Sequence, residues 1–316
     1  MLYTGEYVNR SAFRSFVLSV ICGLLAASGM AAEAAPTVGA TNLVVTSNTV
    51  LADFVVNVAG GRYQVRALAP AGTDPHTFQP TPDSIKVLSQ ARVVFFNGAG
   101  LEEWWDRTIR SAKKPETPVI ELSNGLATIR MPGRSDSTHG HAEGWDPHVW
   151  LDPNLVKAYG DKIRDALSQV DGANAVFYAE RAKAYQAALD DLDAWIRAEL
   201  EKVPVARRKL VTFHNAFQYF ANRYGLAVKG FVVASPGKEP SAKVLAELTR
   251  QIKQEQIPAV FAEADFNAKI LETLARDAGV KVVTNLYDGS LSNGPPADTY
   301  INLMRHNVAQ MVNALK

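Results

Sequence analysis

Cysteine is nearly absent from this sequence. The single residue, Cys22, lies in an apolar stretch near the N-terminus. If that stretch is removed on export, the remaining chain has no thiol. Disulfide frameworks, thiolate metal ligands and cysteine nucleophiles are then excluded together. Any chemistry of the mature chain must use histidine, carboxylate or hydroxyl groups.

An excess of charge of one sign is also missing. The 33 Lys and Arg residues balance 32 Asp and Glu residues, for a net charge of +1. Proteins that bind the nucleic-acid backbone cluster their basic residues, so we expect no nucleic-acid partner. Beyond the N-terminal stretch, no apolar run reaches the roughly 20 residues that a membrane-spanning helix needs.

The N-terminal segment has the pattern of a secretory signal peptide. Arg10 and Arg14 precede the apolar run SFVLSVICGLLAASGM, and AAEAAP then offers an A-x-A cleavage signal that ends at Ala34. We predict a cleaved signal peptide over residues 1–34 and a periplasmic location, with a retained membrane anchor as the alternative. The residues SVI precede Cys22 where a lipoprotein signal has a small residue. We therefore predict that the protein is not a lipoprotein.

Short β-branched runs alternate with helical periodicity along the rest of the chain. Strands are predicted at residues 42–46, 63–68, 92–96, 209–213, 226–233, 258–262 and 281–285. The alternation predicts an α/β fold with two sheets, and 316 residues suffice for two domain cores. We divide the mature chain into an N-terminal α/β domain over residues 35–170 and a C-terminal α/β domain over residues 204–316.

The segment between the two predicted domains lacks strand signals. Apolar residues recur three or four positions apart over residues 174–202, which predicts one amphipathic helix. Its length would be on the order of 45 Å, enough to run past both domains. We interpret residues 171–203 as a rigid connector. The polar, glycine-containing stretch at residues 131–144 predicts a loop.

Three of the six histidines lie in similar settings. GTDPHTFQP and GWDPHVWLDP place His76 and His148 in the same Asp-Pro-His motif, and His214 ends the predicted strand KLVTF. Proline fixes one backbone torsion and so helps to hold the imidazole. Ligands bind at the carboxyl ends of strands in open α/β sheets, and imidazole is the commonest metal ligand. We predict one shared metal centre, although a lone turn histidine is the alternative for either motif alone.

Several longer stretches resemble one family of binding proteins. They are TDPHTFQPTPDSIKVLSQARVVFFNGAGLEEWWDR, DPHVWLDP, FHNAFQYFANRYGL, SPGKEPSAKVL and YINLMRHNV. Together they are similar to the metal-binding solute-binding proteins of zinc and manganese ABC transporters, called cluster A-I, and to its zinc-type, AztC-like members. The resemblance implies two (β/α) sandwich domains joined by a single long rigid α-helix, with one metal in the interdomain cleft. It also implies a monomer that delivers its metal to an ABC transporter permease and its ATPase.

The resemblance also implies a ligand set. The family's three histidine positions fall on His76, His148 and His214. The fourth ligand is normally an aspartate in LYxDxL, but this chain reads LYDGSLS, which puts Gly289 at that position. Glycine has no side chain to coordinate a metal. We therefore predict Asp288 as the fourth ligand, on a turn that Gly289 permits, with an Asx-turn or capping role as the alternative.

The predicted ligands favour zinc. Three imidazoles and one carboxylate suit tetrahedral Zn²⁺, whereas manganese favours more oxygen ligands. Related manganese binders are expected to carry a glutamate where this chain has His214. We predict one Zn²⁺ per chain as the transported ligand. A manganese- or iron-binding member of the same family is the alternative.

Other polar residues carry weaker signals. His139 and His141, in STHGHAEG, resemble a shortened histidine-rich loop of zinc-type members. We interpret them as a zinc-capture loop, with chance histidines as the alternative, and a periplasmic zinc metallochaperone as a further candidate partner. Glu263 ends a predicted strand near the cleft, where it would support the ligands or form a structural ion pair. His306, on the last predicted helix, is expected to be structural.

A secreted zinc metallohydrolase is the rival function, because three histidines and an aspartate also build hydrolytic zinc sites. The chain lacks HExxH, and its only H-x-H pair lies in a glycine-containing loop. No paired acid or base accompanies that pair. A closed site with four protein ligands also lacks the exchangeable water that zinc catalysis requires. We therefore predict a binding protein and no enzyme.

Overall fold

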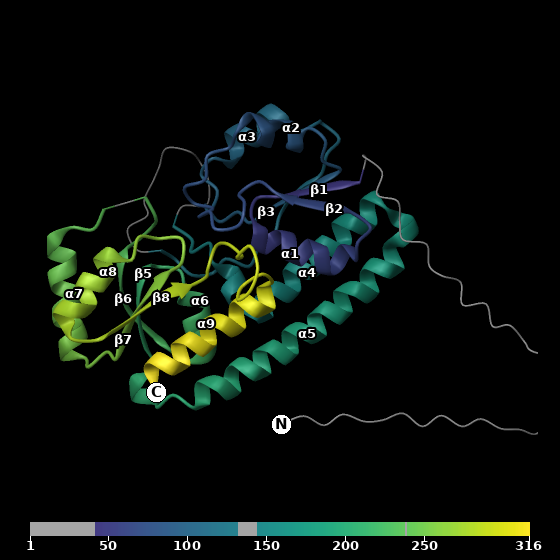
Figure 1. Ribbon diagram of the computed structural model, residues 1–316. Helices are drawn as coiled ribbons and strands as arrows, with labels where there is room; N and C mark the ends of the chain where they lie inside the picture. The colour runs from purple at the N-terminus through teal and green to yellow at the C-terminus, as the bar shows by residue number, and fades with distance from the viewer. Residues whose placement is uncertain (1–41, 132–143, 238) are drawn as a thin grey trace, which may run out of the picture. The chain divides into compact units, whose positions relative to one another are not determined.

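The computed structural model describes residues 42–131, 144–237 and 239–316. The predicted signal peptide, residues 1–34, lies outside these ranges, as do His139 and His141. Two parallel β-sheets organise the described chain (Figure 1). The first has the order β2-β1-β3-β4, with β1 (Leu43–Thr46), β2 (Gln64–Ala67), β3 (Val93–Phe96) and β4 (Val119–Glu121).

The second sheet repeats the strand arrangement of the first. Its order is β6-β5-β7-β8, with β5 (Lys209–His214), β6 (Ala227–Val233), β7 (Ala259–Glu263) and β8 (Lys281–Leu286). Every neighbouring pair is parallel in both sheets. The predicted α/β fold with two sheets is therefore confirmed. In each sheet the strand order changes direction between two central strands, a place where α/β proteins bind ligands.

Helices connect successive strands and cover the sheets. They are α1 (Thr49–Ala59), α2 (Pro82–Leu88), α3 (Trp105–Ala112), α4 (Pro153–Val170), α6 (Gln218–Tyr224), α7 (Ala242–Gln254), α8 (Lys269–Ala278) and α9 (Tyr300–Leu315). Side-chain caps begin several of these helices. At the start of α1, the side chain of Asn48 accepts from the backbone N–H of Leu51. At the start of α4, the side chain of Asp152 accepts from the backbone N–H of Asn154, and Pro153 occupies the first helical position. Among the described residues, no helix has both the length and the apolarity needed to cross a membrane.

The predicted long helix is present as α5 (Ala175–Glu201). Its 27 residues give a length of about 40 Å. The helix packs against α1 and α4 of the N-terminal half and against α9 of the C-terminal half (Figure 1). The buried residues repeat at helical spacing, namely Tyr178, Ala182, Tyr185, Leu189, Leu192, Ile196 and Leu200. The helix therefore contributes to a core shared by both halves.

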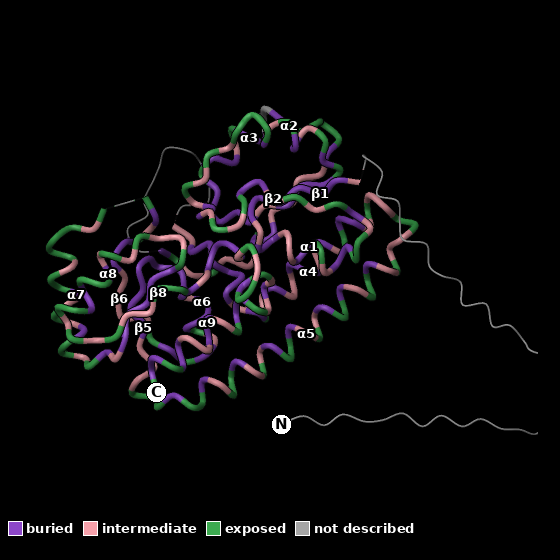
Figure 2. Tube along the Cα trace, viewed as in Figure 1, coloured by how far each residue is buried: buried purple, intermediate pink, exposed green. Residues whose placement is uncertain are grey.

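The largest apolar cluster includes residues of both halves. Buried stretches of the chain are accordingly found in both halves (Figure 2). Phe54 of α1 makes edge contacts with Tyr159 of α4 at 5.9 Å and with Tyr300 of α9 at 5.0 Å between ring centroids. One smaller cluster lies on the other face of each sheet, under α2 and α3 in the first half and under α7 and α8 in the second. Domain boundaries at residues 170 and 204 stay a prediction.

Candidate metal centre

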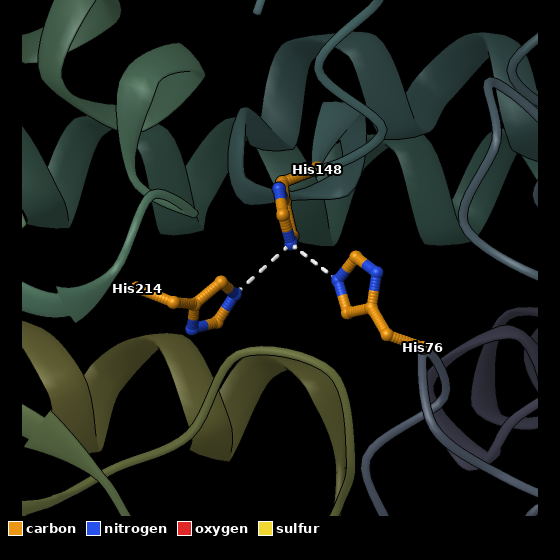
Figure 3. Close-up of side chains that lie close together, drawn as sticks. All are labelled: His76, His148 and His214. Atoms are coloured by element: carbon orange, nitrogen blue, oxygen red, sulfur yellow. Dashed lines mark hydrogen bonds between the residues drawn. The ribbon is translucent and has the colours of Figure 1, made fainter. Parts of the chain in front are cut away.

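Three histidines from distant parts of the chain meet at one point (Figure 3). Nε2 of His148 lies 3.2 Å from Nε2 of His76 and 3.3 Å from Nε2 of His214. His76 lies in the segment after β2, His148 precedes the short 3-10 turn Val149–Leu151, and His214 is the last residue of β5. His148 and His214 are each 1% exposed. The carboxyl ends of both sheets therefore contribute to the cluster.

Asp288, two residues after β8, adds an oxygen to these nitrogens. Its Oδ2 lies 3.2 Å from Nε2 of His214, and the residue is 3% exposed. In a tetrahedral site with metal–nitrogen bonds of about 2.0 Å, the ligand atoms lie about 3.3 Å apart. The measured separations of 3.2, 3.3 and 3.2 Å match that spacing. The three histidine nitrogens all lie within 4.8 Å of one another and could hold one metal ion, and Asp288 contacts this group through His214.

The aspartates of the two Asp-Pro-His motifs hold the histidines. Oδ1 of Asp74 accepts from the backbone N–H of His76 at 2.9 Å, and Oδ2 accepts from the Thr77 hydroxyl at 2.8 Å. Oδ1 of Asp146 accepts from the backbone N–H of His148 at 3.0 Å. Sequence reasoning assigned the rigidity of the motif to proline and missed the aspartate. The repeated Asp was the signal that would have revealed it.

Asp146 also selects the nitrogen of His148 that faces the cluster. Its Oδ1 lies 2.7 Å from Nδ1 of His148, and the two side chains are 0% and 1% exposed. A hydrogen on Nδ1 is donated to the carboxylate, which leaves the lone pair of Nε2 directed at the other two imidazoles. Metal-binding histidines commonly have such a carboxylate partner, which fixes the tautomer and raises ligand basicity.

Glu263 lies behind His214 in a similar way. It is the last residue of β7 and is 0% exposed, and its Oε1 lies 3.5 Å from Nδ1 of His214. Within the described chain, its carboxylate oxygens have no hydrogen-bond partner. The contact involves the nitrogen of His214 that faces away from His148 and Asp288. Glu263 is thus placed to support an imidazole, on the side opposite to the cluster.

The electrostatics of the cluster favour a cation. Burial raises the pKa of the Asp288 carboxyl well above its usual range, against the opposing effect of His214. Burial alone would lower the pKa of His214, but the carboxylates of Asp288 and Glu263 raise it to about 10. Burial, with the charges of Asp74 and Glu263, raises the pKa of Asp265 to about 6. A divalent ion would offset these carboxylates in a region that water solvates poorly.

Gly289 is required for space. Its backbone does not adopt a positive φ. A Cβ atom at this position would lie 2.7 Å from Cδ of Pro75, closer than real contacts allow. The conformational freedom expected of Gly289 is therefore not used. Its missing Cβ instead lets the Asp288 loop approach Pro75, next to His76. A cavity of about 240 Å³ adjoins this loop and is lined in part by Asp265, Asp288 and Ser290.

Of the three remaining histidines, the structure describes only His306, and it is not part of the cluster. His306 lies on α9, where its Nε2 is 2.9 Å from the carbonyl oxygen of Asn285 and its ring contacts Tyr287 at 5.5 Å. This contact agrees with the expected structural role. His139 and His141 lie outside the described residues, so their role in zinc capture stays a prediction.

Curated and solved relatives share most of this chain. The manganese-binding lipoprotein MntA of Halalkalibacterium halodurans is 32% identical over 302 residues, which cover 95% of this chain and 97% of MntA. The periplasmic zinc-binding protein TroA of Treponema pallidum is 31% identical, with a TM-score of 0.77 over 87% of this chain and 99% of TroA. A manganese-bound periplasmic protein of Candidatus Liberibacter asiaticus is 25% identical, with a TM-score of 0.76 over 87% of this chain and 100% of that protein.

The names of the relatives correct one prediction. MntA is named a lipoprotein, and so is the manganese transporter component PsaA of Streptococcus pneumoniae, which is 27% identical over 86% of this chain and 88% of PsaA. The prediction that this chain is not a lipoprotein is therefore wrong. It rested on the bulky residues before Cys22. Export signals are defined by a charged region, an apolar run and small residues together, so one position is too weak a criterion.

A family model confirms the broad assignment. The model of the zinc-uptake complex component A, periplasmic, matches residues 44–314, which include both sheets and all four side chains of the cluster. Proteins of this kind bind metal for a membrane permease and its ATPase and are not enzymes, which excludes the metallohydrolase alternative. This chain belongs to the family of periplasmic metal-binding components of ABC transporters.

Proposed function

We propose that this chain captures one Zn²⁺ between its two sheets and delivers it to the permease of an ABC transporter. The observation that carries the proposal is the spacing of the four candidate ligand atoms, three of which belong to buried residues. Nε2 of His148 lies 3.2 Å from Nε2 of His76 and 3.3 Å from Nε2 of His214. Oδ2 of Asp288 lies 3.2 Å from Nε2 of His214. Each of these three separations is what two neighbouring ligands of one tetrahedral zinc ion would have.

The type of ligand supports zinc over harder metals. Three imidazole nitrogens and one carboxylate oxygen form a borderline set that suits Zn²⁺, whereas Mn²⁺ favours a site rich in oxygen. His148, His214 and Asp288 are buried, so protein groups rather than bulk water surround these ligand atoms. Asp146 and Glu263 contact imidazole nitrogens that face away from the cluster, and we assign them a supporting role.

Manganese is the second candidate because several relatives are named for it. MntA and PsaA are manganese proteins by name, and the Candidatus Liberibacter protein was solved with manganese bound. TroA, at similar identity, is named a zinc-binding protein. Names of relatives at 25 to 32% identity thus point to both metals. The three-histidine ligand set of this chain is our reason for preferring zinc, and an iron-binding role is disfavoured for the same reason.

Two further proposals concern partners. We propose that the chain works as a monomer with the permease and its ATPase, and that a periplasmic zinc metallochaperone loads it. Sedimentation of the zinc-loaded protein tests the first proposal, since a dimer would contradict it. Transfer of zinc from a chaperone faster than release of zinc into solution would support the second. Equal rates would contradict it, because loading would then pass through free zinc.

The metal content of the native protein tests the proposed function. We expect native mass spectrometry of protein purified from its own cell envelope, with elemental analysis, to show one equivalent of zinc. The variant His148→Ala should lose most of that zinc, because it removes the central imidazole of the cluster. The variant His306→Ala is the matched control and should keep one equivalent. One equivalent of manganese in the native protein would contradict the proposal.

A further inference from the structure

The loop that carries Asp288 belongs to the second sheet by sequence but is held by the N-terminal half. It begins after β8, which ends at Leu286. The backbone N–H of Gly72 donates to Oγ of Ser290 at 2.8 Å and contacts the carbonyl oxygen of Leu291 at 3.3 Å. The backbone N–H of Leu291 donates to Oγ1 of Thr49 at 2.9 Å. The loop is thus tied to segments that flank the first sheet.

The shortest of these ties is made by Trp150. Its indole Nε1–H donates to the carbonyl oxygen of Asp288 at 2.6 Å, across 138 residues of chain. Trp150 is 0% exposed, and its own carbonyl oxygen accepts from the hydroxyl of Tyr300 at 2.7 Å. The indole also packs 5.3 Å from the imidazole of His148. One side chain therefore contacts a histidine of the first half and the aspartate loop of the second.

The carboxylate of Asp288 has few other restraints. Its Oδ1 is buried and has no hydrogen-bond partner among the described residues, and its Oδ2 faces His214. The direction of the side chain therefore depends on its backbone position and on the contact with His214. That backbone is held on one side by Trp150 and is limited on the other by the close approach of Gly289 to Pro75.

We propose that Trp150 is a positioning residue for the Asp288 carboxylate, an inference that rests on the proposed role of Asp288 as a zinc ligand. The indole N–H holds the carbonyl of Asp288, while the ring packs against His148. A ligand from each half is thereby kept at a fixed position relative to the other. The fourth ligand is thus presented to the metal by the half that carries His76 and His148, although Asp288 follows a strand of the other sheet.

The test is a double-mutant cycle on Zn²⁺ affinity, measured by competition with a chromophoric chelator. Trp150→Phe removes the N–H donor, and we expect a loss of about 10-fold, within the range for residues that orient a metal ligand. In an Asp288→Ala background the same change should alter affinity by no more than about twofold, because the group it positions is gone. An equal loss in both backgrounds would show a general structural role and would overturn the proposal.

A second replacement guards against loss of folding. Replacing Trp150 with 3-benzothienylalanine keeps the shape of the indole but puts sulfur in place of the N–H, so we expect the same loss of affinity with a nearly unchanged melting temperature. Tyr300→Phe is the matched control. It removes the hydrogen bond from the Tyr300 hydroxyl to the backbone carbonyl of Trp150 but leaves the indole N–H in place. Its zinc affinity should stay within about twofold of the parent.

The outcomes separate the inference from the proposed function. If Asp288→Ala weakens zinc binding but both Trp150 replacements bind like the parent, the inference fails alone. A loss in Tyr300→Phe as large as that in Trp150→Phe also overturns it, because loosening of the core would explain both. If Asp288→Ala itself binds zinc like the parent, the proposed ligand set fails and the inference fails with it.

Discussion

Nε2 of His148 lies 3.3 Å from Nε2 of His214, although the two residues are 66 positions apart (Figure 3). His148 comes after the last strand of the first sheet, whereas His214 ends β5 of the second sheet. A cation bound by both imidazoles would join the two halves of the fold. A ligand that binds only the folded state stabilises it by RT ln(1 + [L]/Kd). Metal loading should therefore be visible as a gain in stability of the whole molecule.

We expect zinc to raise the melting temperature by roughly 8 to 16 °C when its concentration is about a thousand times Kd, since the gain is then about 4 kcal/mol. Differential scanning calorimetry of the metal-free and zinc-loaded protein measures the shift. His214→Ala should abolish most of the shift, because it removes the ligand between His148 and Asp288. His306→Ala should retain it. A full shift in His214→Ala would contradict the prediction.

Asp146→Asn should weaken zinc binding by roughly 10- to 100-fold. The amide oxygen of asparagine can still accept from Nδ1 of His148, but the negative charge that raises the basicity of the imidazole is lost. Calorimetric titration with zinc measures the change. Asp161→Asn, which removes a carboxylate on the partly exposed face of α4, is the control and should bind like the parent. Equal affinities of the two variants would argue against a role for Asp146.

Asp288→Ala should lower zinc affinity by more than roughly 100-fold. Loss of a residue that only supports a ligand typically lowers metal affinity by about 10- to 100-fold, whereas this variant removes a ligand itself. Asp288→Asn should behave similarly, since it keeps the shape of the side chain but not its charge, and charge matters more in a poorly solvated site. Glu263→Gln should have a smaller effect, because Glu263 contacts only the outer nitrogen of His214. The reverse order of effects, with Glu263→Gln the most damaging, would make Glu263 the fourth ligand.

Asp53→Asn should stabilise the protein at alkaline pH. Burial raises the pKa of Asp53 to about 6, although the backbone N–H of Tyr300 donates to its carboxylate. Between pH 4 and 6 the folded state therefore binds more protons than the unfolded state, so the free energy of unfolding falls as pH rises. Two pKa units correspond to at most about 3 kcal/mol. In urea unfolding at pH 8 the asparagine variant should be more stable by up to that amount.

The difference between Asp53→Asn and the parent should nearly vanish at pH 4, where the folded parent is already protonated at Asp53. Metal-free protein is used throughout, so that zinc affinity does not contribute to the comparison. A variant less stable than the parent at pH 8 would show that the carboxylate contributes more through its hydrogen bond to Tyr300 than it loses through burial.

Much of the fold could be predicted from the sequence because its signals are local. Seven predicted strands and the long helix α5 are present. Strand β4 (Val119–Glu121) was missed, since three residues after Pro118 are too few for a β-branched run to stand out. The sequence predicted the length of α5 but not its packing against both α1 and α9. That packing depends on which apolar faces of distant helices meet.

The candidate site residues were predicted from local motifs and, for Asp288, from the family resemblance. The shared Asp-Pro-His sequence identified His76 and His148, and the end of a strand identified His214. The contact between Trp150 and Asp288 spans 138 residues and depends on how two loops meet, so no local pattern encodes it. The need for glycine at position 289 likewise became clear only from its approach to Pro75.

The affinity of the metal-free protein for Zn²⁺ relative to Mn²⁺, measured by competition against one chelator at pH 7, tests the central claim most directly. Three imidazoles and one carboxylate should bind zinc far more tightly, by at least about a thousandfold, because zinc suits this ligand set and stands well above manganese in the affinity series for such sites. A protein that bound manganese within about tenfold of zinc, with more ligands than these four, would contradict the account.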